Sequence, residues 1–221
     1  MHEFKKFTGE ENHAITIVEA LTLIKGFHEH YGPEAAPGPF FDKYAVQAIL
    51  DQPEAVGMRY YYGAGMFNQT QLVLVGTNAN RNDLLEGGLL KLSIMNPPLT
   101  AHGLYNRDAV HHEISLNEAS QLTARYQENL QSGQPKGGFF GKQAIQSLLD
   151  YPGCVGLRFF FGTHKNGERT IVAICVDRFG VDMFYAPMID LSKPCPPICG
   201  LANLLNHSKV SKSITATELA A

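Results

Sequence analysis

The sequence predicts an α+β fold: a tandem duplication of one helix-helix-strand-strand-strand unit with an antiparallel sheet, in a pseudo-two-fold arrangement. The main observation is an internal repeat, in which residues 15–84 align without a gap with residues 114–183 at an offset of 99. Of the 70 aligned pairs, 20 are identical. Each copy also shows helical spacing of apolar residues followed by extended runs rich in branched and aromatic residues. Because a repeat at a fixed period decides the architecture, two copies of one folding unit are the starting point.

The repeat divides the chain into five parts. We expect an N-terminal arm over residues 1–14, a first repeat unit over 15–98, a linker over 99–113, a second repeat unit over 114–205 and a polar C-terminal tail over 206–221. Each unit is long enough to form a hydrophobic core of its own.

The first helix of each unit is predicted by its apolar spacing and by a capping box. Thr16 and Glu19 give the capping pattern in the first unit, and Ser115 and Glu118 repeat it in the second. The apolar positions recur at helical spacing in both copies: Ile17, Ala20, Leu21, Ile24 and Phe27, then Leu116, Ala119, Leu122 and Tyr126.

A second helix is predicted in each unit after a segment rich in glycine, proline and polar residues. We expect these helices over Phe40–Asp51 and Phe139–Asp150. The proline two positions after each helix stops it, because proline disfavours the helical conformation in the residue before it.

Three extended segments complete each unit. The first two are joined by a short polar turn, which favours an antiparallel hairpin. The predicted strands are residues 56–63, 71–77 and 88–95 in the first unit and 155–162, 170–176 and 183–191 in the second. Alternation places Tyr60 and Tyr62 on the face toward the helices.

The middle rings of two aromatic triplets, Tyr61 and Phe160, are candidate binding residues. Alternation turns both rings to the sheet face opposite the helices. Either a second layer covers this face or the face is an exposed apolar patch. We expect the two sheets, or the sheet of a partner subunit, to pack there.

Arg59 and Arg158 are candidate binding residues because each lies in mid-strand at the same position of its copy. One interpretation is an anion site on the sheet. The favoured interpretation is an internal ion pair, because a buried arginine is seldom left without a partner. Three pairs of acidic residues could supply it: Glu19 or Glu118, Asp51 or Asp150, and Asp83 or Asp182.

All four cysteines, Cys154, Cys175, Cys195 and Cys199, lie in the second unit. The shared fold therefore cannot depend on them. Three states remain open: a zinc site, which needs four ligands, a disulfide involving Cys195 or Cys199, and unbonded thiols, which a reducing compartment favours. We expect no cofactor other than this possible zinc, and the nine histidines show no metal-binding spacing.

Composition and charge exclude several functional classes. The formal net charge of −3 lacks the basic character that nucleic-acid binding generally requires. No apolar stretch approaches the roughly 18 residues of a membrane span. The first residues, Met1-His2-Glu3-Phe4-Lys5-Lys6, lack the apolar core of a secretory signal. We therefore expect a cytoplasmic protein without a membrane span or a nucleic-acid partner.

Two stretches of the second unit carry a resemblance to a group of small uncharacterised bacterial proteins. These proteins share a P-G-C-x-G-[hydrophobic]-R-[aromatic] strand and a closing C-P-P-x-C. The matching stretches here are Pro152-Gly153-Cys154-Val155-Gly156-Leu157-Arg158-Phe159 and Cys195-Pro196-Pro197-Ile198-Cys199. The first unit lacks every cysteine of this pattern. The resemblance implies no activity, cofactor or catalytic residue.

No catalytic motif is present, so no catalytic residue is assigned. The chain has no G-x-S-x-G, Walker loop or H-E-x-x-H pattern. The leading hypothesis is a non-enzymatic protein-binding, structural or adaptor component of a bacterial assembly, which binds a protein partner or itself. One alternative is a ligand-binding or enzymatic unit with a site between the repeats that uses Arg59 and Arg158. A second alternative is a zinc or thiol switch in the second unit.

Overall fold

The computed structural model describes residues 6–32, 38–66, 69–86 and 90–207, and these contain four α-helices and two antiparallel sheets. The α+β class is therefore confirmed. The helices are α1 (Ile17–Tyr31), α2 (Lys43–Leu50), α3 (Leu116–Glu128) and α4 (Lys142–Leu149), with a short 3-10 helix, η1, over Arg107–Ala109. Residues 1–5 of the expected arm and 208–221 of the expected tail lie outside the described residues.

Each sheet has five strands that pair in antiparallel fashion. The first sheet has the order β1 (Ala14–Ile15), β9 (Met188–Ile189), β8 (Arg169–Val176), β7 (Gly156–Thr163), β2 (Phe40–Asp42). The second sheet has the order β10 (Lys193–Cys195), β6 (Gly137–Gly141), β3 (Gly57–Ala64), β4 (Thr70–Thr77), β5 (Leu90–Leu92).

The two hairpins and both capping boxes are confirmed. Strands β3 and β4 pair from Gly57 opposite Thr77 to Ala64 opposite Thr70, and β7 and β8 pair in the same way 99 positions later. Thr16 caps α1 and Ser115 caps α3, each with the reciprocal bond from its glutamate. Local spacing in the sequence is thus sufficient to find these elements.

The expectation that each unit builds its own helix-covered sheet is wrong, because strands are exchanged between the units. Strand β2 of the first unit pairs with β7 of the second, and β6 of the second pairs with β3 of the first. The second helices therefore begin three residues later than expected, at Lys43 and Lys142. Apolar spacing could not reveal this, since the pairing joins residues more than 70 positions apart along the chain.

The two sheets are joined along both sides. Phe40 of β2 and Ile94, which follows β5, exchange two backbone hydrogen bonds with N···O distances of 2.6 and 3.1 Å. On the other side, the segment that leaves β9 in the first sheet continues as β10 and pairs with β6 in the second. The two sheets are therefore linked by backbone hydrogen bonds on one side and by the continuous chain on the other.

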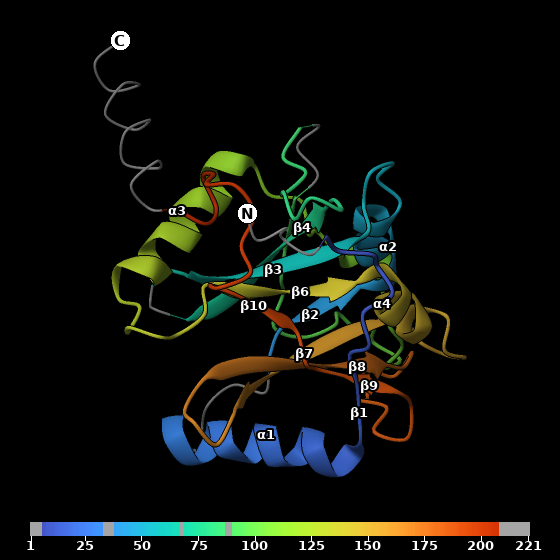
Figure 1. Ribbon diagram of the computed structural model, residues 1–221. Helices are drawn as coiled ribbons and strands as arrows, with labels where there is room; N and C mark the ends of the chain where they lie inside the picture. Colours follow the sequence, from blue (N-terminus) through green and yellow to red (C-terminus); the bar gives the residue numbers. More distant parts are fainter. Residues whose placement is uncertain (1–5, 33–37, 67–68, 87–89, 208–221) are drawn as a thin grey trace.

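The inner core lies between the two sheets, and α2 and α4 lie side by side at one end of it (Figure 1). It contains Tyr60 and Tyr62 from β3, and Phe159 and Phe161 from β7, together with apolar residues of α2 and α4. The sheet face carrying Tyr60 and Tyr62 therefore faces the second helices, as the alternation indicates, but it also faces the other sheet. Burial of this apolar surface provides the main stabilisation of the fold.

Helices α1 and α3 form the two outer layers (Figure 1). Helix α1 packs on β7 and β8, and α3 packs on β3 and β4. Each of these helices therefore covers the hairpin of the other unit. The two units are intertwined and cannot separate as two domains without exposing both outer faces.

Side chains at equivalent positions of α2 and α4 make reciprocal hydrogen bonds to the other helix. The Lys43 ammonium donates to the carbonyl of Leu149, and the Lys142 ammonium donates to that of Leu50. The side-chain amides of Gln47 and Gln146, which are 99 residues apart, exchange hydrogen bonds of 3.1 and 3.0 Å. These cations lie at helix C-termini, where they also interact favourably with the helix dipole.

Candidate functional site

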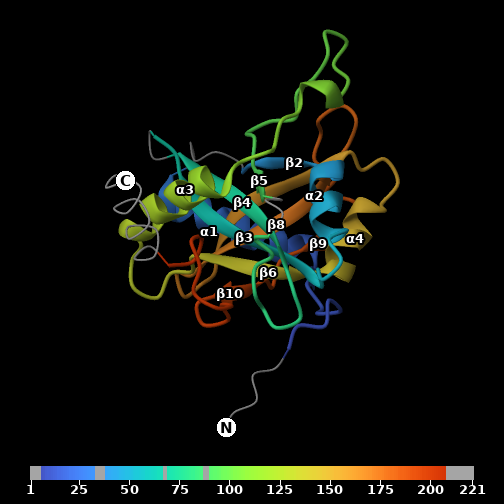
Figure 2. The ribbon, with the colours of Figure 1, turned by 90° about the horizontal axis from the view of Figure 1, so that it is seen from above.

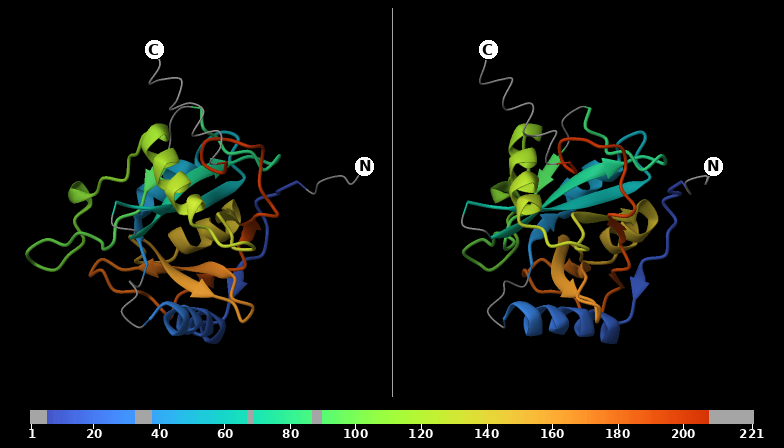
Figure 3. Two further views of the ribbon diagram at one scale, coloured as in Figure 1. Left: turned by 90° about the vertical axis from the view of Figure 1, so that its left-hand side faces the viewer. Right: turned by 60° about the vertical axis from the view of Figure 1, so that its left-hand side comes forward.

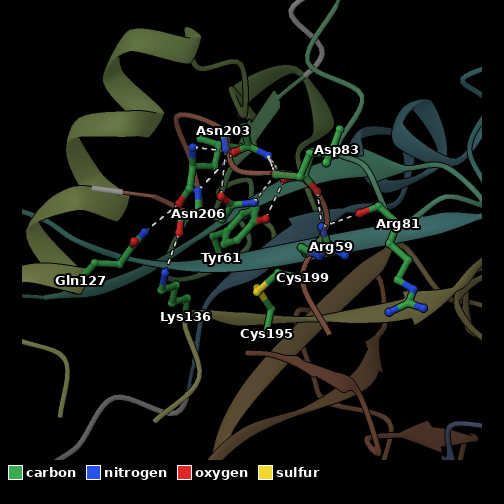
Figure 4. Close-up of a disulfide and its surroundings, with 12 residues drawn as sticks. Arg59, Tyr61, Arg81, Asp83, Gln127, Lys136, Cys195, Cys199, Asn203 and Asn206 are labelled. Atoms are coloured by element: carbon green, nitrogen blue, oxygen red, sulfur yellow. Dashed lines mark hydrogen bonds and ion pairs between the residues drawn. A yellow bond between two sulfur atoms is a disulfide. The ribbon is translucent and has the colours of Figure 1, made fainter. Parts of the chain in front are cut away.

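Arg59 lies at the centre of a buried polar network on the outer face of the second sheet (Figure 4). Its Nη1 is 2.6 Å from Oδ1 of Asp83, and both side chains have 0% exposure. The same nitrogen donates to the carbonyl of Arg81. Burial opposes the charge of Arg59, but the Asp83 carboxylate and Tyr61 outweigh it and raise its pKa. The favoured interpretation, an internal ion pair, is thus confirmed, with Asp83 as the partner.

The second carboxylate oxygen of Asp83 extends the network to two further groups. Tyr61 donates its hydroxyl to Oδ2 at 2.6 Å, and Asn203 donates its amide at 2.8 Å. Burial, followed by the neighbouring Asp83 charge, raises the pKa of Tyr61, which therefore stays a neutral donor. The network connects β3 to the C-terminal segment through hydrogen bonds that are shielded from water.

Arg158 forms the corresponding ion pair in the second unit. Its Nε is 2.7 Å from Oδ1 of Asp182, whose side chain keeps 21% exposure. Its Nη1 donates to the carbonyls of Gly38 and Met95. Arg158 and Arg59 share none of these partners. Among the described residues, the two arginines therefore belong to two separate ion pairs.

The rings of Tyr61 and Phe160 do not mediate the packing of the two sheets, contrary to expectation. Tyr61 packs with Ala119 and Leu122 of α3, and Phe160 packs with Ala20 of α1 and its neighbours. The second layer that covers each ring is thus the first helix of the other unit. The sequence correctly indicates a covering layer but not its identity, because the exchange of helices leaves no local signal.

The cysteines fall into one disulfide and two free thiols. Cys195 and Cys199 form a disulfide that closes a short loop after β10 (Figure 4). Cys154 and Cys175 are buried and free, and they lie close enough to interact. Among the residues that the structure describes, no group of three or more His, Cys, Asp or Glu side chains could hold a metal ion.

The disulfide adjoins the segment that carries Asn203. This segment is also held to α3 and to the start of β6: Gln127 donates to the carbonyl of Leu205, and Lys136 donates to that of Asn206, both at 2.7 Å. Leu205 fills the space between α3 and the second sheet. The disulfide therefore restrains the start of the segment whose Asn203 donates to Asp83 in the Arg59 network.

Replacing both Cys195 and Cys199 with serine is expected to lower the free energy of unfolding by about 2 kcal/mol. The cross-link restricts the unfolded chain, and a loop of only a few residues gains about this much by the chain-entropy estimate. Urea denaturation of the wild type, the double variant and a Cys154→Ser control measures the effect. An unchanged urea midpoint in the double variant would contradict a stabilising disulfide.

His13 and His112 are structurally important residues that the sequence analysis did not single out. Both imidazoles are buried, with 0% and 2% exposure. Nδ1 of His13 donates to the carbonyl of Leu191, and its Nε2 accepts from the backbone N–H of Gly141. The two residues are 99 positions apart, so extending the alignment upstream of residue 15 would have found them.

His112 makes the corresponding contacts in the first unit. Its Nδ1 is 2.7 Å from the carbonyl of Leu92, and its Nε2 accepts from the backbone N–H of Asp42 at 3.0 Å. An acceptor at Nε2 and a donor at Nδ1 require the neutral imidazole. Each histidine thus joins the two sheets at the point where the chain passes between them.

Several exposed apolar side chains lie on the linker, just before it, and on the segment that follows β8. We define this loop–turn surface as the exposed apolar residues of 95–105 and 178–185, whose exposed fractions range from 40% to 76%. They are Met95, Leu99, Leu104, Phe179, Val181 and Tyr185. Figures 2 and 3 show the linker projecting from the body of the molecule.

The two parts of the loop–turn surface are in contact. Tyr105 donates its backbone N–H to the carbonyl of Arg178 at 2.7 Å. Gly180 lies against Leu99 and Pro97: a Cβ atom on this glycine would be 3.4 and 3.3 Å from their side chains. The surface is therefore built from both units, and its geometry is fixed by backbone contacts.

The first unit has the same turn with different chemistry. Backbone N–H groups of Asn78 and Asp177 bond the carbonyls four residues later, and Arg81 and Gly180 have positive φ angles of 69° and 78°. The positions of Phe179 and Val181 are occupied by Asn80 and Asn82 in the first unit. Since the backbone conformation is shared, it does not require the apolar side chains of the second unit.

No protein-family model, curated protein or solved structure matches this chain. In the described part of the chain, no helix combines the length and the apolar character needed to cross a membrane. The functional assignment therefore rests on the geometry of the described residues.

Proposed function

We propose that this protein is a non-enzymatic binding protein, which acts as a structural or adaptor component of a bacterial assembly through the loop–turn surface. The observation that carries the proposal is the exchange of two asparagines for Phe179 and Val181 in a turn whose backbone is the same in both units. Large apolar side chains are costly to expose together, and such patches mark protein contacts more often than chance exposure does.

The contact partner that fits this surface is a protein with a complementary apolar patch, either another protein or a second copy of this chain. Aromatic and aliphatic side chains of this kind provide the anchors of protein interfaces. The positively charged groups Arg107 and Arg178 lie beside the surface with Asp108 and Asp177, so it has no strong charge of one sign. Neither a nucleic acid nor a membrane surface is proposed as the partner.

The experiment compares the wild type with a Phe179→Asn/Val181→Asn double variant, which places the residues of the first unit in the second. Both are used to capture proteins from the source cells, with quantitative mass spectrometry, and both are sedimented to measure self-association. We expect the double variant to capture at least tenfold less of one specific partner than the wild type does. If the wild type is an oligomer, we expect the double variant to sediment as the monomer. Leu201→Asn is the matched control, because Leu201 is exposed beside the corresponding first-unit turn.

Equal recovery of every protein and equal sedimentation of wild type and double variant would contradict the proposal. Circular dichroism and the urea midpoint must show that the double variant keeps its fold. We expect them to do so, because the first unit accommodates asparagine in the same turn.

We further propose that the chain is a tandem duplication whose units are related by a pseudo-two-fold axis, with the boundaries given above. Three reciprocal contacts support this: the lysine bonds to Leu50 and Leu149, the Gln47–Gln146 pair, and the bonds of His13 and His112. In each case both partners are displaced by 99 positions. An axis between Gln47 and Gln146 relates these contacts to one another.

A cytoplasmic location stays a prediction of the sequence. The Cys195–Cys199 disulfide stands against it, because disulfides persist mainly in oxidising compartments. A zinc or thiol switch in the second unit would require this disulfide to open, and no described contact favours that state over the bonded one.

A further inference from the structure

A groove of about 1140 Å³ lies between α1 and the turn that joins β7 to β8. Residues 15–30 form one wall, and residues 163–168 with Asp190 and Leu191 form the other. Helix α1 approaches the hairpin closely at Gly26, where a Cβ atom would lie 2.7 Å from the carbonyl oxygen of Thr163. The loop–turn surface contributes none of the residues that line this groove.

Asp190 is a buried carboxylate in the wall of this groove, with 0% exposure. Its Oδ1 accepts a hydrogen bond from the hydroxyl of Thr170, whereas its Oδ2 has no hydrogen-bond partner among the described residues. Burial raises the pKa of this carboxyl, while Thr170, His164 and the nearby N–H groups of Leu191 and Ser192 favour its charged form. A buried acceptor left without a donor is costly.

A second polar atom in the same wall is also without a partner. The hydroxyl oxygen of Thr163 is buried and makes no hydrogen bond with the described residues. Thr163 follows Gly162, which pairs across the hairpin with Thr170, the donor to Asp190. Thr163 and Asp190 therefore both line the groove, each with an oxygen atom that lacks a partner among the described residues.

The first unit lacks both of these groups at the corresponding positions. Lys91 stands where the second unit has Asp190, and its ammonium is 2.6 Å from the Glu113 carboxylate. Ala14, in the N-terminal arm, occupies the position equivalent to Glu113, so Asp190 has no charged partner there. Thr163 likewise corresponds to Ala64. The shared fold therefore does not need the unsatisfied oxygens.

The remaining lining indicates which ligand chemistry would satisfy these atoms. The groove is lined by four carboxylates and two lysines, with His30 and His164, so its charge is net negative when the histidines are neutral. One lysine, Lys25, is already paired with Glu29 at 3.4 Å. Aliphatic side chains, namely Ile15, Val18, Leu23 and Leu191, lie along the same walls.

We propose that this groove binds an alkylammonium group, with its ammonium at Asp190 and Thr163 and its alkyl chain along the aliphatic walls. An ammonium has three donors and no acceptor, which matches two acceptor oxygens without donors. Such a group occurs in a free aliphatic diamine and in the lysine side chain of a peptide. This site is separate from the loop–turn surface, so it stands or falls independently of the proposed function.

The test is a titration of the full chain at pH 7.5 by isothermal calorimetry, with two probes that distinguish these sources. Cadaverine represents the free diamine, and Nα-acetyl-lysine methylamide represents the peptide side chain. 1,5-Pentanediol, which has the length of cadaverine but no charge, is the matched control ligand. We expect saturable binding of at least one amine and none of the diol. Binding of cadaverine alone identifies a free amine as the ligand, and binding of the blocked lysine identifies a peptide.

Two variants test the residues. Asp190→Asn keeps the size of the side chain and an acceptor for Thr170, and it is expected to weaken amine binding about 10- to 100-fold, the range for a lost hydrogen bond to a charged group. Without ligand, its melting temperature should be equal to or above that of the wild type, since a buried charge is removed. Thr163→Ala, which installs the first-unit residue, should weaken binding severalfold. Glu168→Gln, at the groove and only partly buried, should change it less than threefold.

Absence of saturable binding by either amine up to about 10 mM, the affinity range of very weak ligands, would overturn the proposal. Equal amine affinity of the wild type, Asp190→Asn and Thr163→Ala would also overturn it. If Asp190→Asn does not fold, Thr163→Ala alone decides the outcome.

Discussion

Replacing Asp83 with asparagine is expected to lower the free energy of unfolding by about 3 kcal/mol or more, because it leaves the Arg59 charge buried without a counter-ion. Both side chains of this pair are fully buried, and Arg59 has no second carboxylate among its described partners. Asparagine keeps the size of the side chain and an acceptor for Tyr61. The measured loss in the free energy of unfolding therefore reports the removal of the Asp83 charge. Urea denaturation at pH 7.5 gives the value.

The matched control is Asp182→Asn in the second unit. We expect a smaller loss, of about 1 kcal/mol, because Asp182 is partly exposed and Arg158 keeps the carbonyls of Gly38 and Met95 as acceptors. An Arg59→Met/Asp83→Asn double variant should regain much of the loss, since it buries no unpaired charge. Equal losses in the free energy of unfolding for Asp83→Asn and Asp182→Asn would show that burial does not determine how much these ion pairs stabilise the fold.

Lowering the pH below 6.5 is expected to destabilise the fold through His13 and His112. Burial is the main cause that lowers the pKa of both imidazoles. The unfolded chain therefore binds more protons than the folded chain between the lowered pKa values and about 6.5, the ordinary histidine value. The stabilisation is fully present above pH 6.5 and is lost as the pH falls toward the folded-state pKa values. With two histidines, the limiting slope is about 2.7 kcal/mol per pH unit.

Charged groups near each imidazole modify this effect but do not reverse it. Lys193 reinforces the lowered pKa of His13, and Glu11 opposes it. Asp42 and Glu113 oppose the lowered pKa of His112, and Lys91 reinforces it. Protonation would add a hydrogen to Nε2, which in both residues accepts from a backbone N–H. The sheet junction would then lose one hydrogen bond at each site.

The measurement is the urea midpoint between pH 7.5 and 5.0 for the wild type and a His13→Gln/His112→Gln double variant. Glutamine offers a donor and an acceptor but does not titrate in this range, so the double variant should lose most of the pH dependence below 6.5. His102→Gln/His111→Gln, at exposed positions, is the control and should retain it. A wild-type midpoint that is constant from pH 7.5 to 5.0 would contradict the assignment of neutral, structurally required imidazoles.

The elements that the sequence predicts well are those whose signal lies within one turn or one hairpin. The capping boxes at Thr16 and Ser115 require only residues three positions apart, and the hairpins require only a polar turn between two extended runs. The ion-pair partners Asp83 and Asp182 were among the expected candidates. They could be proposed because both copies carry them at the same distance from the arginine.

The elements that the sequence missed depend on contacts between the units. Residues 40–42 continue the apolar pattern of α2 and look helical, yet they form strand β2 because β7 offers them backbone partners. The same holds for residues 139–141, the part of β6 that lay in the expected helix and that pairs with β3. The loop–turn surface was also not foreseen, since its two parts are about 80 residues apart along the chain.

By itself, the sequence determined the α+β class, the matched hairpins and the capped first helices, because each of these depends on side-chain spacing within a short segment. Only the tertiary structure decided that the units exchange strands and outer helices, that Tyr61 and Phe160 lie under α3 and α1, and that Arg59 and Arg158 occupy separate sites. No sequence feature marks which strands share backbone hydrogen bonds, and the two aligned segments offer almost the same partners. The choice between pairing within a copy and pairing between copies is therefore made by the packing of the whole chain.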